Sequence, residues 1–184
     1  MSKLFSNKYK IIWLTFVVIM PFVFSSCFFA NYPERVNTSF AYNTFYKNLN
    51  PGVNDTVVFT LRLSDSSSLN EYKTIGKTKI TDIQIMFNYY SGIEKPVYFG
   101  KLYYSDTASN NLILIDDEVT AGIAGSYNYY NSIVWDNDKS DNLHEILYRD
   151  KVVKFYFIGS PTHAVITSYF YVLFEIKATV YPNV

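Results

Sequence analysis

The stretch that decides the fold is AVITSYFYVLFEIKATVY, residues 164–181. In its second half the apolar residues Val172, Phe174, Ile176, Ala178 and Val180 occupy every other position, and Leu173, Glu175, Lys177, Thr179 and Tyr181 occupy the positions between and after them. An extended strand turns successive side chains to opposite faces, so a period of two predicts a strand with one buried face. The sequence therefore predicts a long final strand, with residues 172, 174, 176, 178 and 180 facing the core.

Five further segments alternate or form short apolar runs between turn residues, and each is predicted to be a strand. They are TVVFTLRL (56–63), KITDIQIMFNYY (79–90), PVYFGKLYY (96–104), NLILI (111–115) and KVVKFYFIG (151–159). We expect a turn at residues 91–92 to make 96–104 the antiparallel partner of 79–90. The run 111–115 is expected to be buried and closed by acids, and residues 159–161 to form a turn.

One segment has a helical rather than an extended period. In DNLHEILYR (141–149), Leu143, Ile146 and Leu147 share one helical face, and Asp141 is placed to cap the first turn. We expect one or two helical turns there and almost no other helix.

Seven to nine strands with short turns predict an all-β protein built as an antiparallel β-sandwich of two packed sheets. An immunoglobulin-like arrangement is the leading expectation, and a jelly roll or a lipocalin-like barrel is the alternative. Residues 51–184 are assigned to this sandwich domain. Residues 27–50 are expected to form a tether and a first irregular segment or strand.

The amino-terminal residues have the pattern of an export signal. Residues 1–10 carry three lysines and no acid, and residues 11–24 are apolar except for Thr15. The sequence F-S-S-C that ends at Cys27 resembles the lipobox of bacterial lipoproteins. This resemblance implies that residues 1–26 are a removed signal peptide and that Cys27 carries diacylglycerol and a further acyl chain such as palmitate.

Two alternatives to lipidation remain open. Residues 11–29 are long enough to span a bilayer as an uncleaved anchor, and ordinary cleavage near Ser26 would leave a free thiol. All three versions export the domain. With a lipid on Cys27, the protein is expected in the bacterial cell envelope, attached to a membrane at the periplasmic face or the cell surface.

Charge and cysteine content restrict the function classes. Residues 27–184 hold 13 basic and 16 acidic residues, a net charge of −3, which provides no electrostatic footprint for nucleic acid. Cys27 is the single cysteine of the chain, so disulfides within the chain are excluded and the core must stabilise the fold.

No catalytic set is recognisable, and we expect neither an enzyme nor a cofactor. The two histidines, His144 and His163, lack a third ligand at zinc-site spacing, and no G-x-S-x-G sequence occurs. The run Asp116, Asp117 and Glu118 is interpreted as a solvated loop. In DNDKSDN (136–142), Asp136, Asp138 and Ser140 alternate as oxygen ligands would, so they are a calcium candidate; the alternative is an ordinary polar turn.

Tyrosine is unusually abundant, with 18 residues beside 15 phenylalanines. Pairs near predicted turns are the candidate ligand contacts; they are Tyr89, Tyr90, Tyr103, Tyr104, Tyr129 and Tyr130. Core packing is the favoured explanation of such pairs, because in a strand one ring of each pair faces inward. If exposed, these rings suit a glycan or an envelope protein as partner. The competing hypothesis is a structural or accessory subunit that pairs through a strand edge near residues 127–130.

Overall fold

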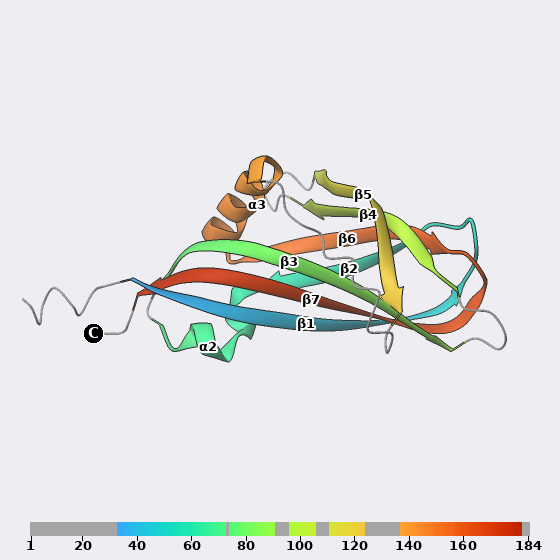
Figure 1. Ribbon diagram of the computed structural model, residues 1–184, viewed down its shortest axis with the longest axis horizontal. Coiled ribbons are helices and arrows are strands. Elements are labelled where there is room, and N and C mark those ends of the chain that lie inside the picture. Colours follow the sequence, from blue (N-terminus) through green and yellow to red (C-terminus); the bar gives the residue numbers. More distant parts are fainter. Residues whose placement is uncertain (1–32, 73, 91–95, 106–110, 124–136, 182–184) are drawn as a thin grey trace, which may run out of the picture.

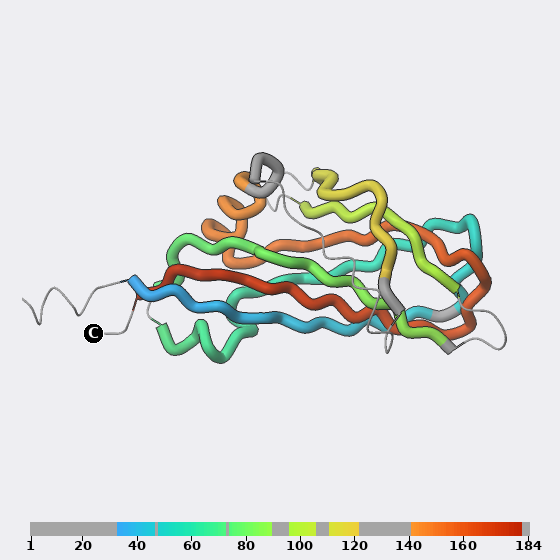
Figure 2. Tube along the Cα trace, viewed as in Figure 1, coloured from blue at the N-terminus to red at the C-terminus, as the bar shows by residue number. Residues whose placement is uncertain are grey.

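The computed structural model describes residues 33–72, 74–90, 96–105, 111–123 and 137–181 of the chain. Within them, seven strands form two layers (Figures 1 and 2). The first layer contains β1 (Glu34–Leu49), β7 (Val165–Tyr181) and β3 (Thr74–Tyr90). The second contains β5 (Leu112–Ile123), β4 (Tyr98–Ser105), β6 (Val152–Pro161) and β2 (Asp55–Arg62). Between β2 and β3 lie the 3₁₀ turn η1 (Leu63–Asp65) and the short helix α2 (Ser67–Asn70).

The order of the strands is β1-β7-β3-β5-β4-β6-β2. The first strand therefore pairs with the last, the second with the next to last, and β4 with β5, all of them antiparallel. This nested pairing is that of a jelly roll, in which a long antiparallel ribbon folds over on itself. The predicted antiparallel sandwich is confirmed, with the jelly-roll order of the alternative. The strand order stays open at β1 and β2, so the sheets do not close into a barrel.

β7 lies in the middle of its layer because both of its edges are paired. Its backbone pairs with β1 from Val165 to Val180 and with β3 from Thr167 to Tyr181. All five residues predicted to face the core, from Val172 to Val180 in alternation, are buried. Burying one full face of a seventeen-residue strand gives this layer its largest apolar contribution.

Aromatic rings fill the space between the layers. Phe87 and Phe170 come from one sheet and Tyr98 and Phe157 from the other, and all four side chains are essentially inaccessible to solvent. The Tyr98 ring lies 4.8 Å from Phe170 and 5.2 Å from Phe157, centroid to centroid, in edge-to-face and tilted geometries. Such pairs add about 0.5–1.5 kcal/mol beyond the area that they bury. The tyrosine hydroxyl is also satisfied, since it donates to the Gly159 carbonyl at 2.6 Å.

Two expectations about β3 need correction. The strand 96–104 does not fold back on β3: β4 pairs with β5 and β6 instead, in the other layer. The alternation within β3 also breaks, because a register shift between Ile80 and Asp82 puts both Ile80 and Ile83 in the core. A β-bulge adds one residue and thereby exchanges the faces of the strand beyond it.

β5 is longer than the predicted strand 111–115, and its apolar start is not buried. Leu112 and Leu114 are 45% and 42% exposed. The acids expected to close the strand lie inside it, and its last residues leave β4 to pair in parallel with Met86 and Phe87 of β3. The predicted turn at residues 159–161 is wrong too, because these residues complete β6.

The helix α3 (Asn137–Asp150) is longer than one or two turns and begins before Asp141. Its predicted apolar face is confirmed, since Leu143, Ile146 and Leu147 are buried. α3 packs beside β3 and β6 and covers one end of the sandwich (Figure 1). In the part of the chain that the structure describes, no helix is long and apolar enough to cross a membrane.

The segment assigned to a tether and a first irregular segment or strand contributes the sixteen-residue edge strand β1. The sandwich therefore begins at Glu34, ahead of the boundary at residue 51. Phe40 and Leu49 are buried, while the side chains of residues 41–46 alternate between exposed and partly buried. Aromatic and polar residues occur on both faces of this edge strand, so its sequence does not show a clear period of two.

Candidate functional site

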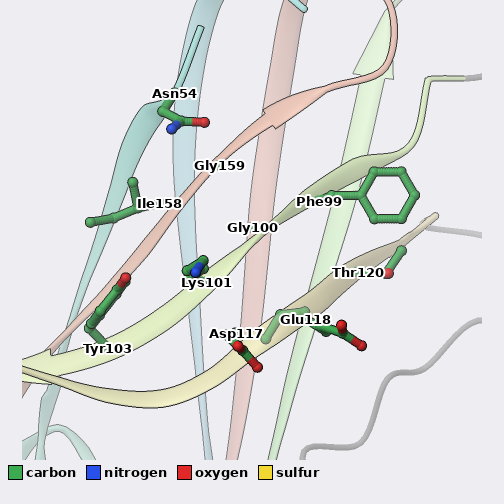
Figure 3. Close-up of a pocket in the computed structure, with 11 residues that line it drawn as sticks. Asn54, Phe99, Gly100, Lys101, Tyr103, Asp117, Glu118, Thr120, Ile158 and Gly159 are labelled. Carbon is green, nitrogen blue, oxygen red and sulfur yellow. The ribbon is translucent and has the colours of Figure 1, made fainter. Parts of the chain in front are cut away.

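A depression of about 670 Å³ lies on the outer surface of the β5-β4-β6 sheet (Figure 3). Four elements line it: the turn before β2, and the strands β4, β5 and β6. The lining residues are Asn54, Phe99, Gly100, Lys101, Tyr103, Asp117, Glu118, Val119, Thr120, Ile158 and Gly159.

Two glycines lie side by side in the depression. Gly100 of β4 and Gly159 of β6 are register partners. A Cβ on Gly100 would stand 2.6 Å from the Ile158 carbonyl oxygen, and one on Gly159 would overlap the backbone of Phe99. The two strands therefore approach so closely that no side chain fits at either position, and the sheet is hollow there.

The aromatic walls of the depression come from β4. Phe99, Lys101 and Tyr103 occupy alternate positions, so all three project from the same face of the strand. Phe99 is 50% exposed, and Tyr103 is partly exposed. Figure 3 shows the two rings at opposite ends of the depression with Lys101 between them. Four residues of strand separate the two aromatic positions by about 13 Å.

The acidic wall depends on irregular pairing between β4 and β5. Leu102 pairs with Asp116. Gly100 lies two residues before Leu102 but pairs with Val119, three residues from Asp116. Tyr103 lies one residue after Leu102 but pairs with Leu114, two residues from Asp116, so β5 has one extra residue on each side of Asp116. The bulge is stabilised by the Asp116 carboxylate, whose Oδ1 accepts the Glu118 N–H at 3.0 Å. Bulges increase twist and redirect side chains. Asp117 and Glu118 are exposed here and lie along the depression (Figure 3).

This arrangement corrects the interpretation of residues 116–118 as a solvated loop. The acids belong to a paired strand and are displayed by its bulges. Their carboxylates accept hydrogen bonds, whereas the Lys101 ammonium donates them and the Asn54 amide does both. Together with exposed rings, these groups suit a ligand that carries many hydroxyls and also has an apolar face.

Of the three candidate tyrosines whose side chains the structure describes, only one lines this depression. Tyr103 does; Tyr104 is 2% exposed and its hydroxyl accepts a hydrogen bond from the Asn142 amide at 3.1 Å. Tyr89 is partly buried against Phe87. The backbone of Tyr90 ends β3, its side chain is not described, and Tyr129 and Tyr130 lie outside the described residues.

Sequence reasoning missed Phe99, Asn54, Asp117 and Glu118 as site residues. The signal for Phe99 was present, because residues 99, 101 and 103 alternate with the buried residues 98, 102 and 104. The tyrosine pair at residues 103–104 combines one partly exposed ring with one buried ring, so a doubled tyrosine does not by itself identify a site residue. The acids carried no such signal, since their position depends on bulges that a period of two does not reveal.

The metal and histidine candidates are separated by the fold. Asp138 and Ser140 belong to α3 rather than to a loop, and Asp136 lies outside the described residues. The described residues contain no group of three or more His, Cys, Asp or Glu side chains placed to hold a metal. His163 precedes β7 at the end of the sandwich far from α3, which carries His144 (Figure 1).

No family model matches this chain, and no curated protein matches it. Several solved virus structures are similar to it. Turnip yellow mosaic virus matches with a TM-score of 0.42 and 9% identity over 83% of this chain and 97% of that one. Desmodium yellow mottle tymovirus matches with a TM-score of 0.36 and 13% identity over 84% of this chain and 91% of that one. The 60-mer BFDV capsid protein matches with a TM-score of 0.36 and 9% identity over 84% of this chain and 97% of that one. Similarity at this level carries no functional conclusion.

Proposed function

We propose that this chain is an exported, lipid-anchored binding module of a bacterial cell envelope that recognises a glycan at the depression on the β5-β4-β6 sheet. The lipobox-like residues that end at Cys27 support the anchor. The described side chains at the depression support non-catalytic recognition, because aromatic faces, carboxylates and one ammonium group surround a concave surface.

The pair of Phe99 and Tyr103 is the observation that carries the proposal. Carbohydrate rings present C–H groups on one face and hydroxyls around their edge. An exposed ring can cover the C–H face while neighbouring carboxylates and amides accept or donate hydrogen bonds at the edge. Phe99 and Tyr103 are four residues apart along β4, or about 13 Å, which exceeds one sugar ring, so an oligosaccharide fits better than a monosaccharide.

Binding to an array of neutral and acidic oligosaccharides tests this function. We expect the chain to bind a defined set of oligosaccharides, and Phe99→Ala and Asp117→Asn each to weaken binding at least about ten-fold, the loss of one good contact. Tyr169→Ala is the matched control, since this ring is also 50% exposed but lies on β7 of the other sheet. An empty array, or equal losses in all three variants, would contradict glycan recognition at the depression.

The lipid anchor is tested separately. In a bacterial host fed with labelled palmitate, the wild-type chain should incorporate the label and lose residues 1–26. Cys27→Ala should incorporate none, because the thiol is the attachment point. Mass spectrometry that found an intact Met1 or an unmodified Cys27 in the membrane-bound protein would exclude the anchor.

A second candidate function is supported by the length of β1. This strand forms one end of the sheet order and runs for sixteen residues, so its outer edge offers backbone groups to a strand of another protein. An accessory role in an envelope assembly would then depend on β1. A photo-crosslinking amino acid in place of Asn43, which is exposed on β1, should yield a specific adduct in cells. The same amino acid in place of Lys154, which is exposed on β6 outside the depression, should not.

A further inference from the structure

A second and larger hollow, of about 930 Å³, lies between α3 and the outer surface of the β1-β7-β3 sheet. We call it the basic groove. Its lining residues are Arg35, Thr74, Gly76, Lys77, Thr78, Lys79, Asp141, His144, Glu145, Tyr148, Lys177, Thr179 and Tyr181. Arg35 near the start of β1 and Tyr181 at the end of β7 both line the groove, so it lies at the end of the sandwich where Figure 1 shows these two strand ends together.

Among its described lining residues, the basic groove has four basic and two acidic side chains. Lys79 on β3 stands directly opposite Lys177 on β7, and Arg35 on β1 pairs with Thr179, two residues further along β7. Lys77 adds a fourth basic side chain, and all four are exposed. Lys79 and Lys177 thus place two positive charges directly opposite each other in the sheet, and an anionic surface above them would reduce their mutual repulsion.

Two tyrosines project from the lining of the same groove. Tyr148 of α3 is 51% exposed and Tyr181 at the end of β7 is 40% exposed. The Lys151 ammonium contacts the face of the Tyr148 ring, with Nζ 4.4 Å from the ring centroid. The same Nζ donates a hydrogen bond to the Ile75 carbonyl at 2.9 Å. Tyrosine is enriched where proteins meet the membrane–water interface, because its ring is apolar and its hydroxyl is polar.

The basic groove is also close to the proposed anchor. Seven residues of chain lead from Cys27 to Glu34, and a fully extended chain of that length spans at most about 25 Å. We infer that the basic groove contacts the anionic surface of the membrane, with Arg35, Lys77, Lys79 and Lys177 facing lipid phosphates. The opposite sheet, which carries the glycan-binding depression, then faces away from the bilayer. This inference rests on the proposed lipid anchor.

Lysine acylation of the lipidated, full mature protein tests the orientation. The protein is reconstituted in vesicles of phosphatidylcholine alone or with one third phosphatidylglycerol, treated with a water-soluble acylating reagent, and mapped by mass spectrometry. In the anionic vesicles we expect Lys79 and Lys177 to react at least about five-fold more slowly, since each basic residue near an anionic surface contributes attraction of that order. High salt should restore their rates. Exposed Lys101 and Lys154, on the opposite sheet, should react equally in both vesicles.

A charge-reversal pair strengthens the test. Lys79→Glu with Lys177→Glu should abolish the protection of Lys77, whereas Lys101→Glu with Lys154→Glu should leave it intact. Inorganic phosphate added to the neutral vesicles distinguishes a free phosphate site, which would protect Lys79 and Lys177 without anionic lipid and overturn the membrane contact. If the protein floats with both vesicles while all lysines react alike, the orientation is wrong and the anchor stands. If the protein does not float, the anchor and the orientation are both lost.

Discussion

His144 on α3 accepts a hydrogen bond from the backbone N–H of Ile80 on β3, with Nε2 and N separated by 3.2 Å. At this position β3 pairs with β7 on one side, while β5 reaches β3 only at Met86 and Phe87. The helix therefore satisfies part of a strand edge that the neighbouring strand leaves uncovered. A nitrogen that accepts must lack a proton, so the bond requires the neutral imidazole with hydrogen on Nδ1.

Acid should weaken this contact. Burial, reinforced by nearby Lys79 and Lys77 and opposed by Asp141, lowers the pKa of His144 below its ordinary value of 6.5. The unfolded chain then takes up the proton more readily than the folded one, so the stabilisation is complete above pH 6.5 and is lost as the pH falls through the lowered pKa. Urea unfolding at pH 7.5 and 5 should show this loss, and His144→Gln should reduce it, because the glutamine carbonyl accepts without titrating. His163→Gln is the control, and an equal effect of both variants would exclude the assignment.

Two tyrosines of β1 connect the edges of the sandwich. The Tyr42 hydroxyl accepts the Arg62 N–H at 3.2 Å, and the Tyr46 hydroxyl donates to the Thr56 carbonyl at 2.9 Å. Both backbone groups belong to β2, the opposite end of the strand order. Tyr42→Phe and Tyr46→Phe should each lower the free energy of unfolding by about 1 kcal/mol, the usual net value of such a bond. Urea denaturation measures it, and no loss in either variant would show that water replaces both bonds.

Alkaline conditions should act on the same link. Burial, with Asp65 nearby, raises the pKa of Tyr42 from 10.0 to about 12. A raised pKa means that folding favours the protonated phenol, so its contribution is complete below pH 10.0 and disappears as the pH rises through about 12. The free energy of unfolding of the wild type should therefore fall more between pH 9 and 11.5 than that of Tyr42→Phe. Tyr169→Phe removes a hydroxyl from an exposed tyrosine and should show the same pH dependence of stability as the wild type. If Tyr169→Phe lost this pH dependence and Tyr42→Phe kept it, Tyr42 would not be its source.

One buried hydroxyl is expected to be unfavourable. Ser168 is inaccessible to solvent, and its Oγ has no hydrogen-bond partner among the described residues. An unsatisfied buried polar group costs about 1–3 kcal/mol, so Ser168→Ala should raise the free energy of unfolding by about 1 kcal/mol. Thr78→Val is the matched opposite, because that buried hydroxyl donates to the Gly76 carbonyl at 3.1 Å and its removal should destabilise. Thermal unfolding of both variants measures the two signs, and a destabilised Ser168→Ala would show that the hydroxyl is satisfied.

Local alternation made most strands of this fold predictable, but it predicted neither the length of β1 and β5 nor the order of the strands. Residues 172–180 and 56–62 alternate without interruption, and both lie in strands with the expected buried face. The sequence contains no equivalent signal for pairing β1 with β7, since contacts between the two ends of a chain depend on the whole ribbon folding together. The predicted hairpin of 79–90 with 96–104 failed for this reason, because a turn signal between two strands does not require that they pair.

The candidate site was predictable only in part. Tyr103 was recognised from the sequence, and the role of its partner Phe99 follows from the same alternation. The placement of Asp117 and Glu118 depends on extra residues in β5, whose register is defined by the partner strand β4. A bulge is a property of the pair of strands, so the sequence of one strand does not reveal it.

Close contact between β4 and β6 should make Gly159 the least replaceable glycine of the site. A Cβ there would overlap the Phe99 carbonyl and the Gly100 backbone, which cannot move without separating the strands. We expect Gly159→Ala to lower the free energy of unfolding by about 3 kcal/mol, the cost of an overpacked position. Gly52→Ala is the informative comparison: Gly52 has a φ of +76° but nothing within 4 Å of its Cβ position, so its loss is backbone strain alone, about 1 kcal/mol. Urea denaturation of the two variants ranks them, and a larger loss at Gly52 would mean that β4 and β6 separate easily and that the hollow between Phe99 and Tyr103 is not a rigid feature of the sheet.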